Sequence, residues 1–323
     1  MISKLKLELR RVIFQGLLGY LSLYPHRLGV LLFRHVLRRR YYTRNLQGFR
    51  MKFDLHDGGI SSVLATAGTR EEETIAILDK ELRPGMTVFD LGANIGFYGL
   101  FMAKAIGDQG FVLSVEPGED NFNLLISNIA LNNLQHRFDT QQIAISNRTG
   151  EGILYVHEQA NLHTLTNFTT KGRDSIVDEI GIPVMSLRDF VFCKSEAHPS
   201  LDLIRMDIEG HEVEVLESLS DVVLEFGIHP LVLFENHFPK YQDNPGRMRK
   251  NLEKLFELGY YVKAMASTDE RLSHLRVIGY SPSEVVKASM RQRGIYEGVS
   301  KEDALDVICD IGTIRTTLLA WRG

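Results

Sequence analysis

Short apolar runs alternate with amphipathic segments between residues 87 and 265, and this alternation predicts the fold. Six runs are predicted to be strands: 87–91, 111–115, 138–145, 201–206, 231–235 and 260–265. Four segments between them have helical spacing: 97–106, 119–132, 212–219 and 247–258. Strands that alternate with helices build a parallel sheet covered on both faces. The pattern therefore predicts an α/β fold with a doubly wound, mostly parallel sheet.

Weaker patterns precede this alternation. Residues 46–55 are predicted to be a small antiparallel pair of strands that turns at residues 57–59. Residues 71–82 are predicted to be a helix, because Pro84-Gly85 follows as a stop signal.

Other patterns interrupt or follow the alternation. Residues 152–157 and 183–185 are predicted to be extra short strands. The segment 267–323 is the least regular, and its polar middle is expected to cap a substrate cleft. Its last apolar run, 316–321, is predicted to be an antiparallel final strand, which brings the main sheet to seven strands.

The composition is that of a soluble globular protein. The 323 residues are 44% apolar and 24% charged, which allows one large domain, or one domain with appendages. Cys193 and Cys309 form neither a disulfide framework nor a C-x-x-C pair. They are expected to be small buried hydrophobes in a reducing compartment, so we expect a cytoplasmic protein.

Charge divides the chain unevenly. Residues 1–50 contain eleven Lys/Arg and one Glu, a net charge of +10, so the remainder of this −4 protein carries −14. We therefore expect a basic amphipathic helical arm over 1–45 and an acidic globular domain over 46–323. The acidic domain argues against a specific nucleic-acid partner.

The basic arm has two interpretations. Its apolar run, 12–24, is shorter than the roughly 20 residues that span a bilayer, and it lacks a signal-peptide cleavage site. Basic residues beside Leu, Phe and Tyr suit a helix on an anionic membrane surface, which would make the protein peripheral on a membrane. The alternative is a pair of helices that cover the sheet or form a homodimer face.

A glycine-rich turn follows the first predicted strand. The sequence there is DLGANIG, with Gly92 and Gly96 flanking Asn94, and Glu116 ends the next predicted strand. Glycines let the backbone approach a ligand closely. A carboxylate at the end of the second strand is placed to accept hydrogen bonds from a ribose diol. These features predict a nucleoside site.

The spacing of this turn bears on which nucleoside it binds. The dinucleotide fingerprint is G-x-G-x-x-G, and Asn94 stands where the second glycine is expected. Asp90 precedes the first glycine, where its charge disfavours a pyrophosphate and suits the ammonium and sulfonium of S-adenosylmethionine (SAM). The pattern resembles motif I of class I SAM-dependent methyltransferases. A dinucleotide site and a purely structural turn are the alternatives.

Two further segments narrow the resemblance. Asp207-Ile208-Glu209-Gly210 follows the strand predicted at 201–206, and Glu71 precedes the glycine turn. In this order the three segments resemble the FkbM family of methyltransferases, over roughly residues 50–265. The resemblance implies a Rossmann-like class I fold and an SAM-dependent O-methyltransferase. Its acceptor would be a hydroxyl of a carbohydrate or of a lipid- or polyketide-like molecule.

The expected cofactor site draws on several segments. Glu116 is expected to hold the ribose hydroxyls, and Ala144 and Ser146 to border the adenine. Glu71 is carried over from the family as a cofactor contact. The methionine end is expected to lie against Asp90, Asn94 and the backbone of Gly92 and Gly96.

A hydroxyl acceptor needs a general base at neutral pH. Asp207 and Glu209 are expected near the methyl group, because they follow the end of a parallel strand. His211 is a further candidate base, and a histidine that makes only local hydrogen bonds is the alternative.

A metal site is a further alternative. Asp207 and Glu235-Asn236 end neighbouring strands and are similar to the Asp…Asp-Asn magnesium site of catechol-type O-methyltransferases, with Glu replacing one Asp. The FkbM pattern does not require Mg²⁺. His237, beside them, is another candidate base.

Two other functions stay open. One is an NAD-type nucleotide-binding oxidoreductase, which the missing second glycine disfavours. The other is a catalytically silent, membrane-associated scaffold with the same fold. The joint presence of Asp90, Glu116, Asp207 and Glu209 argues against the scaffold.

Overall fold

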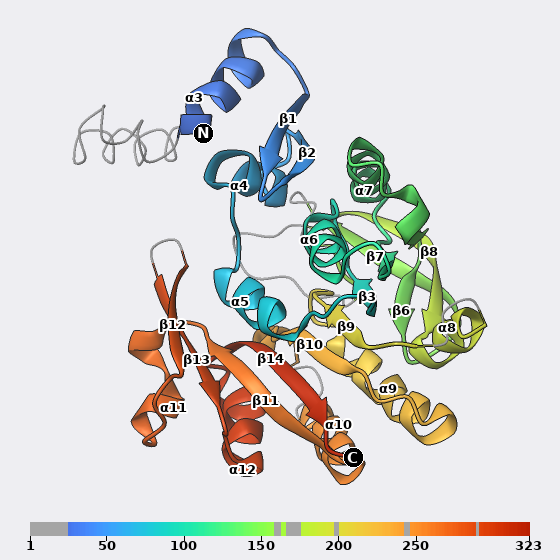
Figure 1. Ribbon diagram of the computed structural model, residues 1–323, viewed down its shortest axis with the longest axis vertical. Helices are drawn as coiled ribbons and strands as arrows, with labels where there is room; N and C mark the ends of the chain where they lie inside the picture. The colour runs from blue at the N-terminus through green and yellow to red at the C-terminus, as the bar shows by residue number, and fades with distance from the viewer. Residues whose placement is uncertain (1–24, 158–162, 166–175, 197–199, 242–245, 289–290) are drawn as a thin grey trace. The chain divides into compact units, whose positions relative to one another are not determined.

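The chain divides into two compact units, Met1–Arg70 and Glu71–Gly323 (Figure 1). The computed structural model describes residues 25–157, 163–165, 176–196, 200–241, 246–288 and 291–323. More than half of the arm predicted over 1–45 lies outside the described residues. The arm and its boundary therefore stay predictions.

The first unit contains a helical segment, a hairpin and a further helix. Its elements are α3 (Pro25–Leu31), η1 (Leu32–Val36), β1 (Tyr41–Leu46), β2 (Phe49–Asp54) and α4 (Ile60–Ala67). β1 and β2 are antiparallel, with Leu46 opposite Phe49.

The prediction for this hairpin was wrong in the position of its strands and in the position of its turn. The chain reverses at Gln47-Gly48, where both residues have positive φ, 51° and 91°. The predicted turn at 57–59 instead begins α4, because the Asp57 carboxylate accepts hydrogen bonds from the backbone of Gly59 and Ser61 at 2.8 and 3.0 Å. Both Gln-Gly and Asp-Gly-Gly are turn signals, and only the pairing of the strands decided between them.

The second unit is built on a mixed sheet of nine strands. Five are parallel neighbours: β5 (Phe138–Gln141), β4 (Phe111–Val115), β3 (Thr87–Leu91), β9 (Leu203–Met206) and β10 (Leu231–Glu235). β14 (Ile314–Trp321) then lies antiparallel between β10 and β11 (Tyr260–Ser267). This confirms the doubly wound, mostly parallel sheet and its antiparallel last strand.

Two strands extend this sheet beyond the predicted seven. β13 (Arg291–Glu297) pairs with β11, and β12 (Glu284–Ala288) forms the edge, both antiparallel to their neighbours. Both strands lie in the segment 267–323, whose sequence pattern was the least regular. Its other elements are α11 (His274–Val277), α12 (Lys301–Leu305), η5 (Glu270–Leu272) and η6 (Asp306–Ile311).

Helices cover both faces of the sheet. The remaining helical segments are α5 (Glu72–Glu81), α6 (Phe97–Ile106), α7 (Glu119–Leu131), η2 (Gln135–Arg137), α8 (Leu187–Lys194), α9 (Glu212–Phe226), η4 (Phe238–Tyr241) and α10 (Arg247–Glu257). Along β3, Phe89 packs edge-on against Phe190 of α8, with ring centroids 5.2 Å apart. The neighbouring Asp90 points toward Gly99 of α6 on the opposite face. Burial on both faces explains why apolar residues point to both sides of β3, with Val88 on one side and Phe89 and Leu91 on the other.

One predicted strand is two strands in different sheets. Residues 138–145 divide into β5, at the edge of the main sheet, and β6 (Ala144–Ser146). β6 pairs with β8 (Ile176–Ser186), which pairs with β7 (Gly150–His157). The run of residues carries strand propensity throughout, and propensity does not show where the backbone changes partner.

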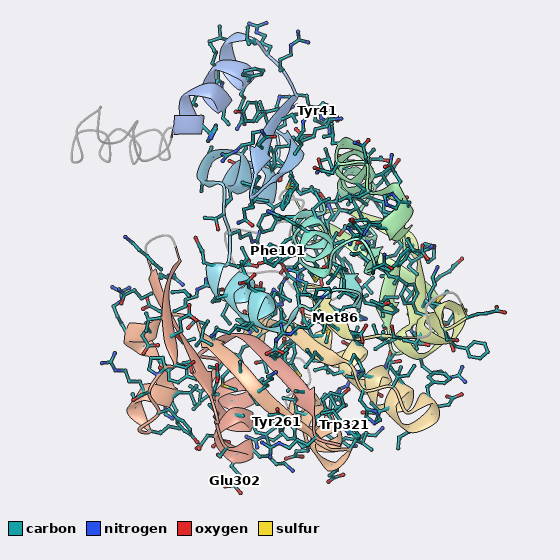
Figure 2. The ribbon with its side chains drawn as sticks, in the orientation of Figure 1. Tyr41, Met86, Phe101, Tyr261, Glu302 and Trp321 are labelled. Carbon is teal, nitrogen blue, oxygen red and sulfur yellow. The ribbon has the colours of Figure 1, made fainter. Side chains whose placement is uncertain are left out.

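The described part of the chain bears on two further expectations. No described helix is both long and apolar enough to cross a bilayer. Cys193 and Cys309 are free thiols, but Cys193 is exposed and Cys309 is only partly buried, so the expectation that both are buried was wrong. Figure 2 shows the side chains on this framework, with Tyr261 of β11 and Trp321 of β14 labelled on adjacent strands.

Candidate functional site

The glycine turn after β3 lies against the chain that leaves β9. Gly92 has a φ of +76°, and a Cβ atom there would lie 2.2 Å from the backbone oxygen of Asp207. Gly92 and Ala93 both donate backbone hydrogen bonds to Val115 at the end of β4. A glycine is therefore required at Gly92 both by conformation and by space.

Gly92→Ala tests this close approach. We expect it to lower the free energy of unfolding by about 1–3 kcal/mol more than Gly85→Ala. Gly85 is the matched control, because it has a similar φ of +86° and nothing near its Cβ position. Thermal or urea unfolding of both variants measures the difference, and equal losses would contradict the contact.

Glu116 joins the end of β4 to the glycine turn. One carboxylate oxygen accepts the backbone N–H of Asn94 at 2.9 Å, and the other accepts that of Gly118 at 2.9 Å. The residue is only 5% exposed. Burial raises the pKa of Glu116 to about 7, although these hydrogen bonds lower it. The carboxylate is thus held rigidly beside the turn and keeps lone pairs for a ligand.

A buried arginine connects three parts of the site. Arg205 of β9 donates to Asp90 at 3.2 Å and to Asp207 at 2.9 Å, and its guanidinium lies 4.1 Å from the centre of the Tyr98 ring. Burial raises the pKa of Asp90, and the charge of Arg205 opposes that shift. Sequence reasoning missed Arg205. The signal was a single charge inside an apolar strand, which must find a partner.

Glu71, carried over from the family, lies beside Asp207. It accepts from the Tyr98 hydroxyl at 2.8 Å and from Arg315 at 3.2 Å, and Arg315 also pairs with Glu235. Burial raises the pKa of Glu235 to about 7. Arg315 lowers this pKa, and the charges of Asp207 and Glu71 raise it. Arg315 of β14 was also missed, because nothing in the sequence shows that the last strand inserts next to β10.

His237 is the imidazole that lies among these carboxylates. Its Nε2 is 3.2 Å from Glu235, 3.5 Å from Glu209 and 3.7 Å from Asp207, and its Nδ1 is 2.9 Å from Glu212. Burial lowers the pKa of His237, but the charges of Glu212, Glu209 and Glu235 outweigh it and raise the pKa well above its usual value. At neutral pH, His237 is therefore a charged donor rather than a base.

Two overlapping sets of side chains have the spacing of a metal site. They are Asp207, Glu209 and His237, and Glu71, Asp207 and Glu235; within each set the ligand atoms lie within 4.8 Å of one another. Carboxylate oxygens suit Mg²⁺. However, Arg205 and Arg315 already pair with three of these carboxylates, Asp207, Glu71 and Glu235, and Lys240 lies 2.6 Å from Glu209. A divalent ion would have to compete with these side chains.

His211 lies in a different environment from the one predicted. Its Nε2 is 2.8 Å from the Ser146 hydroxyl, and its Nδ1 is 3.5 Å from Glu214. Burial lowers the pKa of His211, so the ring is neutral at pH 7. These residues line a cavity of about 250 Å³ that Arg148 and Arg247 also border. The structure pairs His211 with Ser146 and Glu214 and places His237 beside Asp207 and Glu209, so the role of His211 as a base stays a prediction.

Ala144 lies in a small apolar cluster of β6, β7 and β8. Its neighbours there are Leu154, Ile182 and Val184. The adenine contacts expected for Ala144 and Ser146 stay predictions.

The family of the chain follows from a match over more than half of its length. Residues 90–262 match the methyltransferase FkbM domain. The chain belongs to this family. The matched FkbM range contains Asp90, Glu116, Asp207 and His237. Glu71 and Arg315, which pair with each other beside Asp207, lie outside it.

Individual relatives are distant. Methyltransferase sdnD from Sordaria araneosa is 25% identical over 158 residues, which are 42% of this chain and 60% of that protein. The chain thus spans about three-fifths of the length of this curated relative.

Solved structures are more distant in sequence. A methyltransferase FkbM from Methylobacillus flagellatus KT is 16% identical, with 56% of this chain and 40% of that chain covered and a TM-score of 0.38. An O-methyltransferase from Bacillus cereus, solved in complex with SAH, is 10% identical, with 78% and 80% covered and a TM-score of 0.38.

Proposed function

We propose that this FkbM-family protein is an SAM-dependent O-methyltransferase. Its acceptor would be a hydroxyl group of a carbohydrate or of a lipid- or polyketide-like molecule. The observation that carries the proposal is the excess of acid beside the glycine turn. Among the residues that the structure describes there, six carboxylates face four cationic side chains: Glu71, Asp90, Asp207, Glu209, Glu212 and Glu235, against Arg205, His237, Lys240 and Arg315.

This charge balance favours SAM over a dinucleotide. SAM carries a sulfonium and an ammonium, which an acidic site attracts, whereas a dinucleotide brings the negative charges of a pyrophosphate. Burial of the excess negative charge is costly without a cation, and the raised pKa of Glu235, about 7, reflects that cost. Glu116 would accept hydrogen bonds from the ribose diol in either case.

The reaction requires little covalent chemistry from the protein. The acceptor oxygen attacks the methyl carbon, the carbon–sulfur bond breaks, and its electron pair stays on the sulfur as a neutral thioether. The hydroxyl proton passes to a carboxylate, for which Asp207 and Glu209 are the candidates. The protein would otherwise hold the acceptor oxygen in line with the methyl group of SAM and exclude water from the site.

The cavity beside His211 supports a hydroxylated acceptor. Its lining includes the polar side chains of Ser146, His211 and Arg247, and the His211 ring is neutral at pH 7. Ile153 and Val184 also line it. A lining that mixes polar groups with apolar side chains suits a sugar ring, which has hydroxyls at its edge and C–H groups on its faces.

Titration calorimetry with SAM, with its demethylated product and with NAD⁺ tests the cofactor. We expect the first two to bind and NAD⁺ not to bind. Binding of NAD⁺ alone would overturn the proposal in favour of an oxidoreductase, and binding of none would favour the silent scaffold. A screen with labelled SAM over sugars, glycolipids and their amino analogues then tests O-methylation. Methyl transfer to the amino analogues alone would contradict it.

Chelation tests the metal alternative. We expect EDTA to leave turnover unchanged, because Arg205, Arg315 and Lys240 already neutralise the carboxylates that a divalent ion would bind. The measurement is the initial rate before and after treatment with EDTA, with added Mg²⁺ as the control. A loss of rate that Mg²⁺ restores would contradict this expectation.

A further inference from the structure

An exposed segment that is both apolar and basic runs through the first unit, over residues 31–41. Four aliphatic side chains in it are about half exposed or more: Leu31 (53%), Leu32 (47%), Val36 (69%) and Leu37 (50%). Tyr41, labelled in Figure 2, is 41% exposed at its end. Arg34, Arg38 and Arg39 are exposed between them. We refer to this segment as the 31–41 surface.

Other residues of the segment hold it to the hairpin. Val30 is buried, and the ring of Phe33 packs edge-on against Tyr42 of β1, with centroids 5.3 Å apart. The backbone of Leu55 donates to the oxygen of Arg40 at 2.7 Å. The inward side is therefore defined by Val30 and Phe33, and the exposed leucines and valine are not part of the core of this unit.

Three of the four arginines of this surface show no ion pair with another described residue. Arg40 pairs with Asp54 at 2.7 Å, but Arg34, Arg38 and Arg39 have no ion-pair partner among the residues that the structure describes. The whole first unit contains 13 Lys/Arg and three Asp/Glu, a net charge of +10. The second unit carries −14. The positive charge of the protein is thus concentrated in the unit that exposes these aliphatic side chains.

We infer that the 31–41 surface docks on a lipid bilayer that contains anionic lipids. Exposed leucine and valine side chains gain free energy when they insert at the headgroup boundary, and arginines beside them pair with lipid phosphates. A nucleic acid would engage the arginines but would leave the aliphatic side chains in water. The combination therefore favours a membrane. The inference concerns a different unit from the site above and does not rest on the proposed reaction.

Cosedimentation of the full chain with vesicles tests this surface. One set of vesicles is neutral phosphatidylcholine, and the other contains phosphatidylserine. We expect much stronger binding to the anionic set than to the neutral set at physiological salt. Because each arginine near such a surface contributes about a fivefold change in binding, R34Q/R38Q/R39Q should weaken it by about a hundredfold. The matched control is K250Q/K287Q/R291Q, which removes the same charge from exposed positions of the second unit.

A second variant separates insertion from charge attraction. L32S/V36S/L37S keeps the arginines, and we expect it to weaken binding by about tenfold and to remove the part that survives high salt. Circular dichroism and thermal melting establish that each variant folds. Equal binding to neutral and anionic vesicles, no binding, or full binding by the arginine variant would overturn the inference. Full binding by the serine variant would also overturn it, and would indicate a general polyanion surface.

Discussion

Glu116→Ala should weaken the binding of SAM by about 2–4 kcal/mol, since two charge-assisted hydrogen bonds to the ribose diol are lost. The carboxylate is well placed for them, because the backbone N–H groups of Asn94 and Gly118 hold its two oxygens at 2.9 Å. Titration calorimetry measures the loss. Unchanged affinity in a folded variant would remove Glu116 from the cofactor site.

The pH dependence of binding provides a second test of the same residue. Burial raises the pKa of Glu116 to about 7, and only the ionised carboxylate can accept both hydrogen bonds from a diol. The affinity for SAM should therefore rise by about tenfold between pH 6 and pH 8. Glu116→Gln is the control, and its affinity should be weaker and independent of pH over this range. A wild-type affinity that falls with rising pH would contradict the assignment.

The raised pKa of Glu116 also affects the stability of the protein without SAM, and this effect has the opposite dependence on pH. The pKa of Glu116 is higher in the folded protein than its unfolded value of 4.5. Its neutral form therefore favours folding at low pH, and this contribution is lost as the pH rises toward about 7. Stability of the free protein and affinity for SAM should thus respond to Glu116 in opposite directions.

Asp207→Asn and Glu209→Gln should each lower turnover by about a hundredfold or more while SAM still binds. The reason is that a general base contributes roughly 10²–10⁴-fold to the rate, and an amide cannot accept the proton. Single-turnover rates and titration calorimetry separate the two effects. Glu225→Gln is the matched control, because this exposed carboxylate on α9 pairs with Arg188, away from the residues assigned to the site.

The results for Asp207→Asn and Glu209→Gln must be interpreted together with the stability and the SAM binding of each variant. Asp207 is paired with the buried Arg205, so the asparagine variant needs a thermal melt to show that it folds. Activity that survives both substitutions would refute a catalytic role for these residues. Loss of SAM binding, with a normal melt, would make Asp207 a residue that positions the cofactor instead.

The sequence by itself determined the order of most elements of the main sheet and the place of the glycine turn. The helix predicted at 97–106 is α6 with the same bounds, and the strands at 87–91, 111–115 and 231–235 are β3, β4 and β10. These elements are buried, and burial imposes an apolar periodicity that can be recognised locally. Gly92 and Glu116 were likewise recognisable, because a close approach and a strand-end carboxylate have local signatures.

Only the tertiary structure decided which charges meet. Arg205, Arg315 and His237 come from three different strands or strand ends, and they converge on Asp207 and its neighbours because β9, β10 and β14 lie side by side. His211 is four residues from Asp207 in the sequence, yet its ring contacts Ser146. Electrostatic pairing depends on distances in space, which strand order sets. The sequence therefore indicates that charges are buried here, and the fold determines how they pair.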